Sequence, residues 1–367
     1  MLVEGKISIR QFTILVFLIT IGDSILVIPS TTTGFAKQDV WIAGIVALIA
    51  GLLTICLFSS VGRLYPSRTL IEYNEKILGT WLGKFASMLF LVFVAINTTS
   101  YARSLGAFIV TAIMPETPIE IIILIFIFAT IIGVRLGLET LARIGELLFP
   151  WFILLFFSFF LFLSLQIDLE NFQPILAKGF KPVFAGSIVF TSFPFMELVV
   201  LLMIIPFVNR VDRVRKGLII GSFLGGLVLI TITFLCIAVL GVYLTSNDIF
   251  PSYTLAKKIS IGGFLERVEA ILAVMWFITL FFKFSVYFYS LNLGLAQVLK
   301  CRDLKILTIP VGILMFTLST VIAPNLMYLN YVGIKYWPFF DFTFSVILPL
   351  LLLGVYTVRK WLKAGIG

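Results

Sequence analysis

Two short stretches interrupt long apolar runs in this sequence, and together they decide the fold. The first is residues 21–29, IGDSILVIP, and the second is residues 193–197, FPFME, which Pro206 follows. In hydrocarbon, backbone N–H and C=O groups must be paired, so a helix interrupted by glycine or proline needs a cavity or other protein beside it. Each stretch also carries one acid, Asp23 or Glu197. The sequence therefore predicts two discontinuous membrane helices that border a cavity.

The composition around these stretches is that of an integral membrane protein. Of the 367 residues, 60% are hydrophobic and 12% are charged, whereas about a quarter of a soluble protein is charged. A helix needs about 20 apolar residues to cross a bilayer. We therefore expect an all-α integral membrane fold in which residues 1–367 form a single transmembrane domain with about ten transmembrane helices. The expected spans are 11–35, 40–62, 85–113, 118–137, 147–166, 183–208, 217–244, 267–297, 305–323 and 337–358.

The two discontinuous helices occupy matching places in the two halves of the chain. One opens the first set of five spans, roughly residues 11–166, and the other opens the second set, roughly residues 183–358. Because five is odd, the two halves enter the membrane in opposite directions. This pattern is typical of inverted-repeat transporters, which bind their solute at the midplane between discontinuous helices.

The basic residues predict the orientation of the chain. Most of its 27 lysine and arginine residues fall on connectors on one side of the predicted spans. Positively charged connectors stay on the cytoplasmic side, so we expect both termini in the cytoplasm of an inner-membrane protein. The net charge of +9 is then explained by the basic residues on the cytoplasmic connectors, which lie against membrane lipid. We therefore expect no nucleic-acid partner.

The residue types also exclude several kinds of chemistry. The chain contains no histidine, and its three cysteines are widely scattered. Histidine-based catalysis, a cysteine-rich metal cluster and a disulfide framework are therefore not expected. The sequence shows no clustered acidic metal site and no nucleophile motif, so we expect no metal, no cofactor and no enzymatic activity.

The interrupted helices favour a solute of a particular kind. Free amides and the dipole at the start of a half-helix favour a carboxylate, whereas free carbonyls and an adjacent acid favour an amine. A site that offers both suits a zwitterion such as an amino acid. Within the site, Asp23 has two compatible interpretations, as acceptor of a solute amine or carrier of a proton, and as cap of the second half-helix.

Three further charges lie within predicted spans, where charged groups are costly and usually functional. Glu197 is likewise interpreted as the acceptor of a solute amine or as a carrier of a proton. The structural alternative is an ion pair with Lys283. Lys283 has two functional interpretations: it takes the place of a bound metal cation, or it gains and loses a proton during a transport cycle. The structural interpretation is that it only neutralises the charge of Glu197 or Asp23. Arg103 is a further candidate for ion or proton coupling or for an ion pair.

Polar residues of the third span form a stripe. Asn97, Tyr101 and Ser104 share one helical face, so they line a cavity or hydrogen-bond a neighbouring helix. We expect Asp341 to be solvated at the outer interface of the last span, and Trp337 nearby to anchor the interface. Residues 68–80 predict a short amphipathic helix along the inner membrane face.

Several motifs in the same order resemble one known family. They are the stretch 21–29; Tyr65-Pro66-Ser67 before a short helix that ends at Leu78-Gly79; Arg143 followed by Phe149-Pro150; Asn171-Phe172 with Pro174; Phe195-Met196-Glu197; and Glu266-Arg267-Val268-Glu269 before Trp276. Together they resemble the permease-like B subunits of the nutrient germinant receptors of endospore-forming bacteria, a branch of the amino acid–polyamine–organocation superfamily.

The resemblance implies a LeuT-like fold and a receptor that signals germination from the spore inner membrane, together with an A subunit and a lipoprotein C subunit. The nutrient is an amino acid, or else a sugar or nucleoside. The implied pocket lies between helices 1, 3, 6 and 8 and includes Gly22, Asp23, Ser24, Phe195, Met196 and Glu197, with Asn97 and Tyr101 of the polar stripe. In sodium-coupled relatives helix 8 binds a cation, whereas here Lys283 occupies that region and would repel Na⁺. The alternative is an autonomous proton-coupled amino-acid permease.

Overall fold

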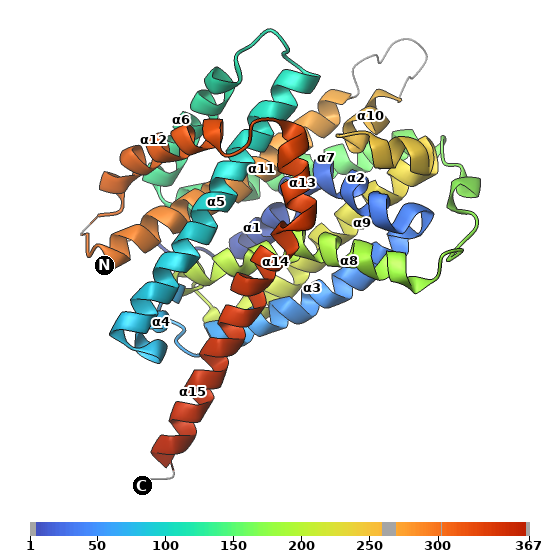
Figure 1. Cartoon of the computed structure of the whole chain (residues 1–367). Coiled ribbons are helices and arrows are strands. Elements are labelled where there is room, and N and C mark those ends of the chain that lie inside the picture. Colours follow the sequence, from blue (N-terminus) through green and yellow to red (C-terminus); the bar gives the residue numbers. More distant parts are fainter. Residues whose placement is uncertain (1–4, 259–268, 302, 365–367) are drawn as a thin grey trace.

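Helices make up almost the whole of the described chain, which comprises residues 5–258, 269–301 and 303–364 of a computed structural model (Figure 1). Within these ranges, eight helices are long and apolar enough to cross a membrane, or nine if α12 and α13, bent by 97° at their junction, form one span. That count takes residues 24–62 as one helix, although Lys37 has a φ of 53° and separates two helical segments. The described residues of each of the ten apolar stretches expected from the sequence are mainly helical, which confirms the all-helical membrane fold.

The first half of the chain runs from α1 to α7. Its elements are α1 (Ile9–Ile21), α2 (Ser24–Ala36), the short 3-10 helix η1 (Lys37–Asp39), α3 (Val40–Gly62), α4 (Leu70–Leu78), α5 (Thr80–Ala112), α6 (Ile119–Leu136) and α7 (Leu138–Ser164). Helix α4 is the expected short amphipathic helix, and a capping box between Thr69 and Glu72 fixes its start.

The second half runs from η2 to α15, which projects beyond the bundle at the bottom of Figure 1. Its elements are η2 (Leu169–Phe172), α8 (Phe180–Phe195), η3 (Met196–Met203), η4 (Ile205–Phe207), η5 (Val211–Arg213), α9 (Val214–Asn247), α10 (Pro251–Lys257), α11 (Glu269–Val298), α12 (Lys305–Val321), α13 (Leu326–Lys335), α14 (Trp337–Phe342), the π-helical η6 (Thr343–Ile347) and α15 (Leu348–Ala364). Residues Glu266 and Arg267 lie outside the described part of the chain.

The first predicted interruption separates α1 from α2. Gly22 has a φ of 41° and a ψ of −128°, and only glycine adopts a positive φ without a steric penalty. Further along α2, Pro29 has no N–H, so the Ile25 carbonyl loses its partner within the helix. The hydroxyl of Ser252 on α10 donates to that carbonyl at 2.9 Å. The carbonyl that the proline leaves free is therefore satisfied by a group from outside the helix.

The second predicted interruption is a change of helix type, not a gap. Helix α8 contains Pro194 in its last turn and passes directly into the 3-10 helix η3 at Met196. A proline in this position removes a backbone donor and disturbs the regular α-helical pattern. The chain thus remains helical here, but its backbone carbonyls point in new directions at the junction of α8 and η3.

The two interrupted spans run in opposite directions. Ile7, just before α1, donates its N–H to the Phe207 carbonyl at 2.9 Å, and Asn209 donates back to Ile7 at 3.0 Å. The first interrupted span therefore begins where the second ends. Such an arrangement is what two inverted halves require, while the limits of the repeats, 11–166 and 183–358, remain predictions.

Glycines let neighbouring helices close around the end of α8. A Cβ atom at Gly51 of α3 would lie 2.3 Å from Cγ of Phe195, and one at Gly226 of α9 would lie 2.8 Å from its Cζ. Real side-chain atoms do not approach so closely. The Phe195 ring therefore packs against two glycines, and this packing fixes the position of the α8–η3 junction.

We predict that Gly51→Ala lowers the thermal unfolding temperature of the purified protein in detergent. The added methyl group must displace the Phe195 ring, and such overpacking typically costs about 1–3 kcal/mol. Gly354→Ala on α15 is the matched control, because no heavy atom lies within 4 Å of its added Cβ. Equal melting of the Gly51 variant and the wild type would contradict this account of the packing.

Candidate functional site

A buried lysine joins the two interrupted spans. Lys283 lies in the middle of α11, and its side chain has no exposed area. Its ammonium lies 2.7 Å from Oδ1 of Asp23, between α1 and α2, and also forms an ion pair with Oε2 of Glu197, near the start of η3. We call Asp23, Lys283 and Glu197 the ion triad. Both acids that the sequence placed at interruptions therefore meet at one ammonium.

The backbone around the triad makes room for Lys283. A Cβ atom on Gly22 would lie 2.2 Å from Cδ of Lys283, so a larger residue cannot occupy that position without displacing the lysine. The ammonium also donates to the Phe193 carbonyl at 3.3 Å. One turn earlier on α11, the Thr279 hydroxyl donates to the Gly22 carbonyl at 2.8 Å. Groups on α11 thus bind exposed carbonyls of both interrupted spans.

Glu197 is fully buried, and hydrogen bonds satisfy both of its carboxylate oxygens. Tyr101 of α5 donates to Oε2 at 2.6 Å, and the indole N–H of Trp337 on α14 donates to Oε1 at 3.3 Å. Tyr287 donates to the backbone carbonyl of Glu197 at 2.6 Å. Glu197 is therefore held by α5, α11 and α14 together.

Asp23 has fewer partners than Glu197. Among the described residues, Lys283 alone hydrogen-bonds its carboxylate. With all three groups ionised, the triad combines one positive and two negative charges and carries a net charge of −1. Burying an uncompensated charge is costly, so the triad favours a further positive group beside Asp23.

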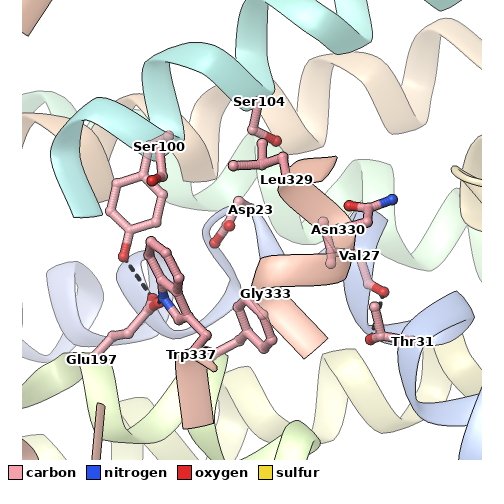
Figure 2. A pocket seen from close by; sticks show the side chains of 12 residues that line it. Asp23, Val27, Thr31, Ser100, Ser104, Glu197, Leu329, Asn330, Gly333 and Trp337 are labelled. Atoms are coloured by element: carbon pink, nitrogen blue, oxygen red, sulfur yellow. Dashed lines mark hydrogen bonds between the residues drawn. The ribbon is translucent and has the colours of Figure 1, made fainter. Parts of the chain in front are cut away.

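Asp23 faces a small cavity of about 50 Å³ (Figure 2). Pockets for drug-sized ligands typically measure about 300–1,000 Å³, so in this conformation the cavity is nearly closed. The lining combines polar and apolar side chains from α2 and its N-cap, α5, α8, η3, α13 and α14. They are Asp23, Val27, Thr31, Ser100, Tyr101, Ser104, Phe193, Glu197, Leu329, Asn330, Gly333 and Trp337.

A second and larger hollow lies between α2, the end of α9 and α13. It measures about 360 Å³ and includes Ser30, Asn247 and Asp248 in its lining. Thr31 of α2 and Asn330 of α13 line both spaces. The pair therefore lies between the open hollow and the closed cavity, at a place that we call the neck, and Asn330 belongs to α13.

The structure brings only some of the predicted site residues to the cavity. Asp23, Tyr101 and Glu197 line it, whereas Gly22, Ser24, Asn97, Phe195 and Met196 do not. The Asn97 side chain donates to the Phe93 carbonyl at 3.1 Å, and the Met196 carbonyl accepts a bond from Ser345 at 2.5 Å. Phe195 instead packs against glycines, because α3 and α9 lie on its side of α8.

Charged residues outside the triad are placed differently from expectation. Arg103 is half-buried, and its guanidinium donates to the Pro324 carbonyl at 3.4 Å, so it does not join the ion triad. The expectation that Asp341 is solvated at an interface was wrong, because α14 packs against α8 and buries it completely. Trp337 was likewise expected at the interface but is buried against Glu197.

The sequence reasoning missed the contribution of α13 and α14. Leu329, Asn330, Gly333 and Trp337 all line the cavity, yet residues 324–336 look like an ordinary polar connector between two spans. A connector of this length is unusual between closely packed helices. Its length was therefore the one feature of the sequence that could have indicated an additional structural element here. The stripe on α5 was a better guide, since Ser104 and Tyr101 both line the cavity.

We predict that Lys283→Met strongly destabilises the protein. Removing one partner of a buried ion pair costs about 3–5 kcal/mol, and here two carboxylates would remain without a cation. Thermal unfolding in detergent measures the effect, with exposed Lys305→Met as the control. Adding Asp23→Asn and Glu197→Gln to Lys283→Met should restore part of the stability. Wild-type melting of the single variant, or no recovery in the triple variant, would contradict the triad.

Comparison with solved structures identifies the fold. The chain superposes on Mhp1, a nucleobase-cation-symport-1 family transporter with bromovinylhydantoin bound, with a TM-score of 0.68 and 13% identity over 90% of this chain and 75% of that chain. It superposes on MhsT in complex with L-phenylalanine with a TM-score of 0.65 and 14% identity over 97% and 99% of the two chains. A Na⁺-coupled sialic acid symporter gives a TM-score of 0.63 at 14% identity, over 94% and 80%. These are LeuT-fold transporters, so the expected LeuT-like fold is confirmed.

Sequence comparison identifies the family. Spore germination protein KB of Bacillus subtilis (strain 168) is 30% identical over 364 residues, which cover 98% of this chain and 96% of that protein. Spore germination protein A2 of the same organism is 26% identical over 93% of this chain and 92% of its own length. The family model described as "Spore germination protein" matches residues 6–327. The chain belongs to the spore germination protein family of multi-pass membrane proteins with a LeuT-type fold.

Proposed function

We propose that this protein is the nutrient-binding, permease-like subunit of a spore germinant receptor, and that it holds a small amino acid in the cavity beside the ion triad. Membership in the spore germination protein family supports the receptor role. The observation that carries the choice of ligand is the charge of the triad, in which one ammonium serves two buried carboxylates.

The cavity offers complementary groups for both ends of a zwitterion. The solute ammonium would pair with Asp23, whose carboxylate faces the cavity (Figure 2). The solute carboxylate would accept a hydrogen bond from the Ser104 hydroxyl on α5, and a second from Ser100 once that hydroxyl turns away from the Ile96 carbonyl, to which it donates at 2.9 Å. A hexose or a nucleoside carries no ammonium group to compensate the triad, so an amino acid fits better. MhsT, which shares the fold, was crystallised with L-phenylalanine.

The orientation and the partners complete the proposal. Lysine and arginine are concentrated on the connectors at the α4 end of the bundle, so we place α4 and both termini in the cytoplasm. The neck between Thr31 and Asn330 then faces away from the cytoplasm, and a nutrient enters past α13. In this proposal the protein resides in the spore inner membrane, and nutrient binding shifts it between two conformations that A and C subunits sense.

The alternative function is an autonomous proton-coupled amino-acid permease, which the likeness to three transporters favours. Uptake of a radiolabelled amino acid by the purified chain alone in liposomes would support the permease. Saturable binding without uptake would support the receptor subunit.

We predict that Asp23→Asn weakens amino-acid binding without removing the protein from the membrane. The substitution removes a charge-assisted hydrogen bond worth about 1.5–3 kcal/mol, which corresponds to roughly a tenfold to a hundredfold loss of affinity. The measurement is thermal stabilisation of the purified protein by the proteinogenic L-amino acids, a hexose and a nucleoside. Asp212→Asn, at an exposed position, is the control. Stabilisation by the hexose or nucleoside alone, or an unchanged response in Asp23→Asn, would refute the amino-acid site.

We predict that ligand binding does not require sodium. The ammonium of Lys283 already lies beside the first interruption and both acids, so a sodium ion there would meet a fixed positive charge at short range. Replacing Na⁺ by choline should leave the amino-acid-induced rise in unfolding temperature unchanged. A rise that appears only in sodium buffer would show that Lys283 does not take the place of a coupling cation.

A further inference from the structure

A third buried acid lies apart from the ion triad. Asp341 of α14 has no exposed area. The Ser192 hydroxyl on α8 donates to its Oδ2, whereas Oδ1 has no hydrogen-bond partner among the described residues and no surface that water can reach. Of the described lysine and arginine side chains, none lies within 4.0 Å of this carboxyl group. Asp341 is therefore enclosed with one hydroxyl as its hydrogen-bond partner.

The other buried acids among the described residues have partners or exposure that Asp341 lacks. Asp23 and Glu197 share the Lys283 ammonium, and Asp39 accepts the backbone N–H of Leu176 at 2.9 Å while keeping some exposure. An ionised carboxylate without a cation or several donors cannot be buried at an acceptable free-energy cost. A carboxylic acid that carries its proton avoids the cost of burying a charge.

The charged and titratable groups around Asp341 do not change this conclusion. The elements packed on α14 are α8, η3, η6 and α13, and α11 lies behind η3. Lys335 of α13 is exposed and donates to Tyr331 at 2.8 Å. Lys283 forms its ion pairs with Asp23 and Glu197, not with Asp341. The titratable groups on these elements and at the start of α14 are Lys181, Glu197, Glu269, Lys283, Tyr287, Tyr289, Tyr328, Tyr331, Lys335 and Tyr336.

We propose that Asp341, together with Ser192, is a proton-binding site, and that Asp341 carries a proton in this conformation. The proton comes from bulk water and is released to it, so the carboxylate becomes a carboxylic acid and no other bond changes.

The position of the site gives the proton a mechanical consequence. Helix α14 contacts the α8–η3 junction twice, through Asp341 to Ser192 and through Trp337 to Glu197. Because Asp341 is buried between α14 and α8, separation of these two helices would open it to water. Protonation therefore favours the packed arrangement, and release of the proton accompanies separation of α14 from the junction. This inference does not depend on which nutrient the cavity binds.

Infrared difference spectroscopy of the purified protein tests the proposal directly. In the wild type at neutral pH we expect the carbonyl-stretch band of a protonated carboxyl group. This band should shift when H₂O is exchanged for D₂O under detergent conditions that open the contact between α14 and α8. The band should disappear in Asp341→Asn and persist in the control Asp212→Asn. Absence of the band from the wild type, or its persistence in Asp341→Asn, would overturn the proposal.

A second variant covers the case in which Asp341→Asn does not fold. Ser192→Ala removes the hydroxyl next to the acid but keeps the acid itself, so the band should remain and move in frequency as the hydrogen bond is lost. An unmoved band in Ser192→Ala would assign the protonated group elsewhere and contradict the site. Stabilisation of the wild type by Na⁺ or K⁺, with loss of this effect in Asp341→Asn, would identify a metal-ion site and likewise overturn it.

Discussion

The structure depends on one buried ammonium that serves two carboxylates. Lys283 reaches Asp23 and Glu197 from the middle of α11, and these acids lie at the interruptions of the two discontinuous spans. Desolvating an ion costs several kcal/mol, and the cost is offset only when opposite charges meet in good geometry. The three residues therefore fix three helical elements relative to one another. Gly22 completes the constraint, because any side chain there would collide with the lysine.

The same constraint explains why the cavity lies where it does. Both carboxylate oxygens of Glu197 accept hydrogen bonds, whereas the carboxylate of Asp23 faces the cavity and accepts a hydrogen bond from Lys283 alone among the described residues. The negative charge left over is thus directed toward the space that a solute would occupy. Helices α13 and α14 close that space, and Trp337 joins the closing element to the triad through Glu197. In our proposal a nutrient that binds there alters contacts of α13 and α14, which gives a physical route from binding to a change of conformation.

Sequence reasoning reached the interruptions and the acids because their signals are local. Glycine or proline beside an acid within an apolar run is visible without any knowledge of packing, and Asp23 and Glu197 were located in this way. The roles of Phe195 and Asp341 depend on which helices lie beside them. The residues next to them in the sequence give no information about those neighbouring helices. Phe195 packs against glycines of α3 and α9, and Asp341 is buried because α14 folds against α8. The cavity wall from α13 was missed for the same reason, since Asn330 lies in a segment that resembles a connector.

Solid-state nuclear magnetic resonance of the labelled protein in lipid bilayers tests the central claim most directly. Dipolar couplings between ¹⁵N of the Lys283 ammonium and the ¹³C-labelled carboxyl carbons report their separations, and the Lys283→Met spectrum assigns the signal. The account predicts that this nitrogen couples strongly to the carboxyl carbons of both Asp23 and Glu197. A Lys283 nitrogen that couples to neither carboxyl group would contradict it.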